Sequence, residues 1–299
     1  MSIAEHPPEL PYPKLPFRNA VRLAYSTFFS HFADVLRAAW LWLIATAALT
    51  AYTSWQQWTW MADAVGMIAA RQPPRMALPA QVSMLLQLDN VLMILAGVSI
   101  AVAWHRLMIL NERPGISGAN VASGNLWRYV LVGFLLCVIT MVPVIVTLGG
   151  RYFLMPATSG PGQMVPTAFF PLFLAGSALC VASLAVMLRL MLLLPARAVG
   201  NRDLSFRQTW QRTRGNAWRL FWGLIITTFP LLLLAQIIIV ASVGFPNPML
   251  LQGGDAMMQM TAISTVVIVY YLLILPISIG FLSHAYRHFF EHPLGQPSP

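Results

Sequence analysis

Charge is scarce in this chain of 299 residues: only 9% of them are Asp, Glu, Lys or Arg, whereas 58% are hydrophobic. A soluble domain carries about 25% charged residues, so this chain has too little charge to cover a water-facing surface of its size. Apolar runs of roughly 20 residues recur, which is the length that crosses the hydrocarbon core of a bilayer. These runs do not alternate as barrel strands do. The sequence therefore predicts an all-α, polytopic membrane protein.

Signs of secretion are also missing. The two cysteines, Cys137 and Cys180, fall inside apolar runs and lack the spacing of metal ligands. They cannot form the disulfide framework of a small secreted protein, and we interpret them as packing residues. The stretch MSIAEHPPELPYPKLPFRNA has no basic start followed directly by an apolar run, so we do not expect a signal peptide. We expect residues 1–16 to be a disordered cytoplasmic leader and residues 293–299 to be a cytoplasmic tail.

Acidic residues are too few and too scattered to indicate catalysis. None lies at the centre of an apolar run or forms a close pair suited to acid–base work; the nine are Glu5, Glu9, Asp34, Asp63, Asp89, Glu112, Asp203, Asp255 and Glu291. His284, His288 and His292 recur at four-residue spacing, which can hold a metal. No Cys, Asp or second His pair is positioned nearby, so we favour a polar, interfacial helix end there and at His105. The sequence predicts a non-enzymatic protein with no metal and no cofactor.

Six predominantly apolar segments are long enough to span a bilayer within a single membrane domain, residues 17–292. We predict the spans at residues 35–55, 88–110, 126–148, 168–194, 218–243 and 262–285. Trp55, Trp58 and Trp60 follow the first span, where their amphipathic rings suit the membrane–water boundary. Before the second span we expect a short, separate helix lying on the outer surface and broken by the Pro73–Pro74 pair.

The distribution of Lys and Arg predicts the orientation. Arg71, Arg75 and Arg151 lie outside if the N-terminus is cytoplasmic. The remaining fifteen of the 18 then lie in cytoplasmic segments or span ends: Lys14, Arg18, Arg22, Arg37, Arg106, Arg113, Arg128, Arg189, Arg197, Arg202, Arg207, Arg212, Arg214, Arg219 and Arg287. The positive-inside rule therefore places both termini in the cytoplasm of a bacterial inner membrane. The same rule explains the net charge of +9 without nucleic-acid binding.

A short motif occurs twice, 91 positions apart: SGNLWRY begins at Ser123 and RGNAWRL at Arg214, where the third and fifth spans start. Before the second copy, apolar residues at helical spacing with arginines opposite indicate an amphipathic helix in the interface. Residues 17–28 repeat this design, and residues 115–127 are a weaker version with small residues. Each even span returns with an arginine near its end. We therefore predict three repeats of an interfacial helix plus two spans.

The segment that begins at Arg189, RLMLLLPARAVGNRDLSFRQTWQRTRGNAWRLF, carries a family resemblance, to which AWHRLMILNERP adds. It resembles the membrane-domain family found fused to some glycerophosphodiester phosphodiesterases, and small inner-membrane proteins of the YciC-like type. The likeness is strong over about residues 100–130 and 186–225. It implies a six-span inner-membrane protein. We expect no phosphodiesterase barrel, which would need about 250 residues, and so no hydrolysis.

Arginines at the cytoplasmic span ends are the candidate site for anionic lipid or another ligand: Arg106, Arg189, Arg207, Arg212, Arg214, Arg219 and Arg287. Arg189 stands just inside the fourth span, where a charge is costly and often functional. It either binds an anionic head group or only snorkels toward lipid phosphate. Arg106 and Arg287 have similar places, so the three could share one basic pocket. The expected partners are the lipid bilayer, anionic lipid and a protein that docks on this face.

A transporter or permease for a small amphiphilic or anionic solute is the alternative. Internal repeats and spans interrupted by Pro143, Pro230 and Pro276 favour it. The interior lacks the acidic or histidine relay of a proton-coupled carrier, which counts against it. We interpret Gln236, Tyr270 and Tyr271 as mid-span partners of interhelical hydrogen bonds.

Overall fold

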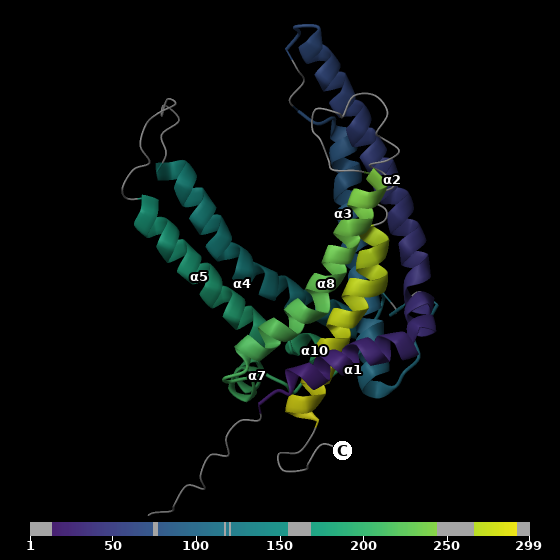
Figure 1. Ribbon diagram of the computed structural model, residues 1–299, viewed down its shortest axis with the longest axis vertical. Coiled ribbons are helices and arrows are strands. Elements are labelled where there is room, and N and C mark those ends of the chain that lie inside the picture. The colour runs from purple at the N-terminus through teal and green to yellow at the C-terminus, as the bar shows by residue number, and fades with distance from the viewer. Residues whose placement is uncertain are drawn as a thin grey trace, which may run out of the picture.

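The computed structural model consists of helices (Figure 1) and describes residues 14–73, 77–116, 118–119, 121–154, 169–243 and 266–291. Among these residues no strand occurs, which confirms the all-α class. The elements are α1 (Phe17–Ser30), α2 (Phe32–Ala69), α3 (Ala80–Leu110), α4 (Gly124–Leu154), α5 (Phe169–Leu190), α6 (Leu193–Ala198), α7 (Phe206–Arg212), α8 (Ala217–Val243), the π-helical turn η1 (Tyr270–Ile274) and α10 (Leu275–Phe290).

Six helices are long and apolar enough to cross a membrane, which confirms the six-span prediction. They comprise Phe32–Ala69, Ala80–Leu110, Gly124–Val146, Leu174–Ala198, Ala217–Ile238 and Val266–Phe290. Each overlaps one predicted span. The last of them is the most buried, because α10 packs against α1, α3 and α8. It therefore forms the centre of the bundle.

The first span differs from the prediction at its end. We expected a separate surface helix after Trp60, but α2 continues without a break to Ala69. Residues 56–69 contain no proline and only one glycine, Gly66, so nothing in the backbone interrupts the hydrogen-bond ladder. The helix ends at Ala70, and Arg71 adopts a left-handed conformation (φ 55°). The prediction of a separate helix was wrong.

The described residues before the third span also differ from the prediction, because they do not form the expected helix. Where residues 115–127 enter α4, the described residues form turns and an isolated bridge between Gly115 and Gly118. Gly118 has a φ of +76°, which favours glycine. The hydroxyl of Ser99 donates to the Ala119 carbonyl at 3.0 Å, and the N–H of Ala119 donates back to the Ser99 carbonyl at 3.2 Å. A short helix thus precedes the first and the third pair of spans, whereas the described residues before the second pair form turns.

Helix α1 lies across the ends of α8 and α10 (Figure 1) and packs against both. Its Ala20, Ala24 and Phe28 are buried. The hydroxyl of Tyr25 donates to the carbonyls of Ile226 and Thr227 at 3.2 and 3.3 Å. Helices α4 and α5 pack against each other and lean away from the other long helices in the same view. The short helices α1 and α7 therefore lie at the end of the molecule where the long helices come together.

Candidate anion-binding face

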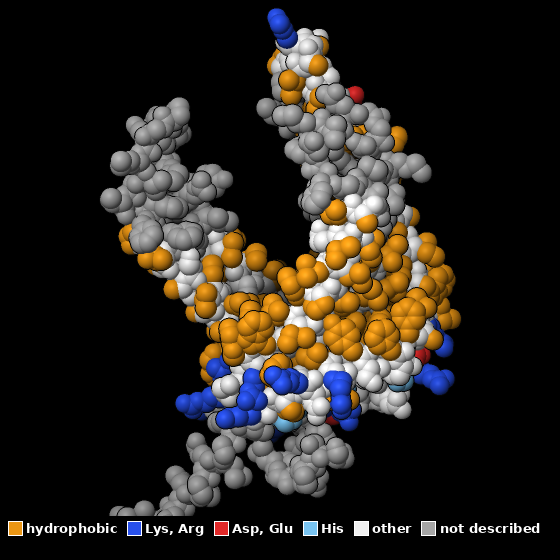
Figure 2. Space-filling view, viewed as in Figure 1, with side chains coloured by type: hydrophobic (Ala, Val, Ile, Leu, Met, Phe, Trp, Pro, Cys, Tyr) orange, Lys and Arg blue, Asp and Glu red, His pale blue; other side chains and the backbone are white. Residues whose placement is uncertain are grey.

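Lys and Arg side chains gather at one end of the molecule, below a belt of apolar side chains (Figure 2). We call this end, which carries α1, α7 and the last turns of α5 and α10, the arginine face. All seven arginines of the candidate site belong to described elements or to the turns beside them. Their contacts decide which of them are available to a ligand.

Arg189 is bound to α7. Its guanidinium lies over the indole ring of Trp210, 3.4 Å from the centroid. Its Nε donates to the hydroxyl of buried Thr213 at 3.3 Å, and its Nη2 donates to the carbonyl of Trp210. A cation over an aromatic face is attracted by the ring quadrupole. Arg189 therefore joins the end of α5 to α7 and positions the short helix.

Helix α7 is fixed at its start by a capping box. The hydroxyl of Ser205 accepts from the backbone N–H of Gln208 at 3.2 Å, and the Gln208 side chain accepts from the N–H of Ser205 at 2.9 Å. These two bonds satisfy donors that a helix N-terminus leaves open. The side chains of Phe206 and Trp210 remain 40% exposed. The helix thus presents an aromatic surface that is held from both ends.

Three of the seven arginines are exposed: Arg207, Arg212 and Arg214. The salt bridges within the described residues pair neither Arg207 nor Arg214 with a carboxylate. Arg212 is engaged, because its Nη1 donates to the carbonyl of Phe289 at 3.0 Å. Arg207 and Arg214 are therefore the best placed of the seven to bind an external anion at α7.

The three arginines at the ends of the even spans contact different segments. Arg287 pairs with Glu291 one turn later, at 3.1 Å. Arg106 pairs with Glu112 at 2.7 Å and donates from Nη1 to the Ala198 carbonyl at 3.2 Å. Arg189 binds α7 as above. Of these three, Arg106 lines a polar cavity of about 310 Å³ between the end of α3 and the start of α4.

The repeated motif has a role that the sequence did not reveal. In the second copy, the Oδ1 of Asn216 accepts from the backbone N–H of Leu15 at 2.9 Å, and the Nη1 of Arg219 donates to the Leu15 carbonyl at 2.8 Å. We call this arrangement the Leu15 clamp. In the first copy, Arg128 donates to the Oδ1 of Asn125 at 3.3 Å. The literal repeat was the available signal, but it does not identify the residue held.

The histidines are placed differently from the expectation in one case. We expected His105 at a polar helix end, but its side chain is fully buried. Its Nδ1 lies 2.8 Å from the hydroxyl of Ser283, because α3 packs against α10 at this level. His284 lies 3.5 Å from Thr27, and His292 is outside the described residues. Within the part of the chain that is described, no three His, Cys, Asp or Glu side chains form a metal-binding group.

A second cavity, of about 380 Å³, lies between α3, α4 and the π turn. Tyr129, Tyr270 and Tyr271 line it together with apolar residues and Gly97. The hydroxyl of Tyr271 donates to the carbonyl of Met93 at 2.6 Å, which confirms it as the partner of an interhelical hydrogen bond. Single π turns inside helices are frequent at functional sites.

Comparison with protein-family models, with curated proteins and with solved structures gives no match for this chain. The family resemblance of the segment that begins at Arg189 therefore stays a prediction. The chemistry of the site rests on its own residues: exposed guanidinium groups beside aromatic rings bind anions.

Proposed function

We propose that this chain is a non-enzymatic integral protein of the bacterial inner membrane, with both termini cytoplasmic, that binds anionic phospholipid head groups at the arginine face. The observation that carries the proposal is α7 with the turn that follows it, where exposed Arg207 and Arg214 accompany the half-exposed rings of Phe206 and Trp210. Aromatic rings and arginines that are exposed together at the end of a span are typical of a segment that lies in a membrane interface. A protein partner on the same face is the competing occupant.

The charges of Arg207 and Arg214 are enough to make a measurable difference in binding to an anionic membrane surface. A Lys or Arg near an anionic membrane surface contributes about 1 kcal/mol to binding, which is roughly fivefold in affinity. Arg207 and Arg214 together should therefore raise the affinity for an anionic membrane surface roughly twenty- to thirtyfold at low salt. The attraction weakens as salt rises, because it acts between exposed charges.

Native-membrane nanodiscs test this proposal. The intact protein is purified with its surrounding lipid, and its mass is recorded with whatever stays bound. We expect retained anionic lipid, and we expect the Arg207→Gln/Arg214→Gln double variant to lose most of it. The Arg189→Ala variant should also lose lipid while still folding, because α7 is no longer held. Arg71→Gln, at the far end of α2, is the matched control and should keep the lipid.

The other outcomes are informative. Equal lipid retention in wild type and the double variant contradicts the proposal. In that case the arginines serve only to set the orientation of the protein in the membrane. A retained protein subunit that the double variant loses would make the arginine face a docking site for that partner.

Transport of a small amphiphilic or anionic solute is the second candidate. The cavity of Tyr129 and Tyr270 beside a π turn favours it, since breaks in regular spans line transport sites in other membrane proteins. Solute uptake into sealed proteoliposomes tests it. Uptake that disappears in Tyr129→Phe/Tyr270→Phe, with an unchanged Arg207→Gln/Arg214→Gln control, would support transport over surface binding.

A further inference from the structure

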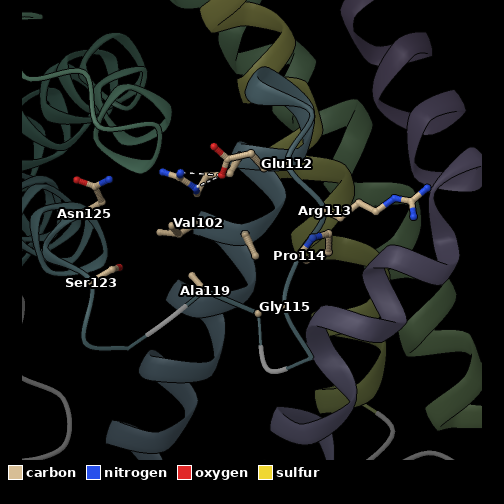
Figure 3. A pocket seen from close by; sticks show the side chains of 11 residues that line it. Val102, Glu112, Arg113, Pro114, Gly115, Ala119, Ser123 and Asn125 are labelled. Atoms are coloured by element: carbon tan, nitrogen blue, oxygen red, sulfur yellow. Dashed lines mark hydrogen bonds and ion pairs between the residues drawn. The ribbon is translucent and has the colours of Figure 1, made fainter.

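The cavity at the junction of α3 and α4 has the composition of an anion site that is separate from α7. It encloses about 310 Å³ and is lined by eleven residues, among them Arg106, Glu112, Ser123 and Asn125. Figure 3 shows Ser123 and Asn125 on one side and Glu112 on the other, whereas the side chain of Arg113 points away. The volume is at the lower end of the range of small-molecule sites, about 300–1,000 Å³.

The contact between Arg106 and Glu112 is incomplete as an arginine–carboxylate pair. Both Nε and Nη2 of Arg106 donate to the same oxygen, Oε2, at 2.8 and 2.7 Å. An arginine edge with two parallel N–H groups is satisfied best by two oxygens of one planar or tetrahedral anion. The Glu112 side chain is about half exposed, so solvent can replace it at little cost. An anion with two oxygens to offer would bind this edge better than Glu112 does.

The opposite wall adds a second source of positive potential. Helix α4 begins at Gly124, and the hydroxyl of Ser123 accepts from the N–H of Leu126 at 3.3 Å. The first amide groups of a helix carry a partial positive charge and bind phosphate well. The cavity thus has a guanidinium on one side and a helix N-terminus on the other, against the single carboxylate of Glu112.

The described residues of the segment between α3 and α4 are held against α3. Asn111 ends α3 in a left-handed conformation, φ 56°. A Cβ on Gly118 would collide with the Ser99 hydroxyl, and two hydrogen bonds join Ser99 of α3 to Ala119. A site that needs no ordering on binding loses less entropy when the ligand is bound.

We propose that this cavity binds a phosphoryl anion through Arg106 and the N-terminus of α4, and that Glu112 competes with the anion for the same guanidinium edge. Val102, Pro114 and Ala119 supply apolar wall beside the charged groups, so the carbon portion of a phosphate monoester or of a lipid head group fits there as well. The site shares no residue with α7 and does not depend on the function proposed for that helix.

The test measures phosphoryl binding with the charge of each partner removed in turn. The full chain is placed in nanodiscs of phosphatidylcholine, and the affinity for inorganic phosphate and for phenyl phosphate is measured by calorimetry. Glu112→Gln should tighten binding by up to about fivefold, because a half-exposed arginine–glutamate pair contributes at most about 1 kcal/mol and no longer competes. Arg106→Gln should abolish detectable binding, and Arg106→Lys should weaken it because the fork is lost.

The Arg287–Glu291 pair provides the matched control, since it is also an arginine–glutamate pair at the end of a span but does not line this cavity. Glu291→Gln and Arg287→Gln should leave phosphate affinity unchanged. A second series in nanodiscs with phosphatidic acid separates the two sources of ligand. Competition by the lipid for phenyl phosphate identifies a head-group site, and its absence identifies a soluble phosphate site.

Two results would overturn the proposal. One is an affinity in Glu112→Gln no tighter than in wild type. The other is phosphate binding in Arg106→Gln equal to wild type. Thermal unfolding of both variants checks that they remain folded, and Arg106→Lys keeps the test valid if Arg106→Gln does not fold. The Arg207→Gln/Arg214→Gln variant should bind phosphate normally, so failure at α7 and failure at this cavity are distinguishable.

Discussion

The side-chain Oδ1 of Asn216 accepts a hydrogen bond from the backbone N–H of Leu15 at 2.9 Å, across 201 positions of the chain. Both residues are buried, with Asn216 only 1% exposed. The main-chain carbonyl of Asn216 accepts a second hydrogen bond, from the N–H of Leu220 at 2.9 Å, within the first turn of α8. One residue at the start of the fifth span therefore fixes both that span and the segment that leads into α1.

Asn216→Ala should destabilise the protein by about 1–3 kcal/mol, because the buried N–H of Leu15 loses its acceptor. Unfolding monitored in bicelles gives the difference. Asn125→Ala is the matched control from the other copy of the motif, and its effect should be smaller because its partner Arg128 is only half-buried and can bind water. Equal losses in the two variants would show that the Leu15 clamp adds nothing.

Gly223→Ala should destabilise the contact between α8 and α10. A Cβ at this position would overlap the ring of Phe281, which is fully buried, and overpacking of this kind costs about 1–3 kcal/mol. At Gly133 the nearest atom to a Cβ is Leu194 Cδ2 at 3.9 Å, so Gly133→Ala should be neutral or stabilising. A stable Gly223→Ala protein would mean that the two helices separate at little cost.

Thr50 and Asp89 join α2 to α3, since the Thr50 hydroxyl donates to Asp89 Oδ1 at 2.9 Å in a buried contact. Thr50→Val should cost about 1–3 kcal/mol, because the carboxyl group loses this donor. The double variant Thr50→Val/Asp89→Leu should recover most of the loss, since replacing both partners with apolar groups is nearly neutral. A double-mutant cycle measures the coupling, and strictly additive losses would argue against it.

Labelling with a membrane-impermeant maleimide tests the orientation. Asp63→Cys, near the far end of α2, and Arg207→Cys, on α7, should react from opposite sides of sealed vesicles. The native Cys137 and Cys180 lie within spanning helices and should stay unlabelled, which makes the wild type the background control. Reaction of both new cysteines from the same side would exclude the six-span arrangement with the arginine face on one side only.

The fold class was predictable because each span carries its own apolar signal. Hydropathy alone identifies six runs that exceed the thickness of the hydrocarbon core. The continuation of α2 to Ala69 was harder to predict from the sequence. The tryptophans suggested a membrane interface, but tryptophan does not interrupt a helix. The turns around Gly118 were misread as a weak amphipathic helix, since glycine and small residues fit both structures in one sequence.

The candidate site was predictable as a set of residues but not as a set of contacts. The positive-inside pattern selected the arginines. Which of them bind internal groups depends on contacts across long sequence separations, such as Arg219 with Leu15 and Arg212 with Phe289. Local periodicity carries no information about these pairs. The Arg106–Glu112 contact is short in sequence, but its cavity also requires the start of α4.

The Leu15 clamp also bears on the order of events during biosynthesis. Helix α1 packs mainly against α8 and α10, so its partners are made last. A ribosome that adds about 5–20 residues per second needs about 10–40 s to pass from Leu15 to Asn216. During that interval the first helix waits without the residues that hold it. Ribosome-bound chains that stop before the fifth span should therefore expose this helix to proteases, and release of the full chain should protect it.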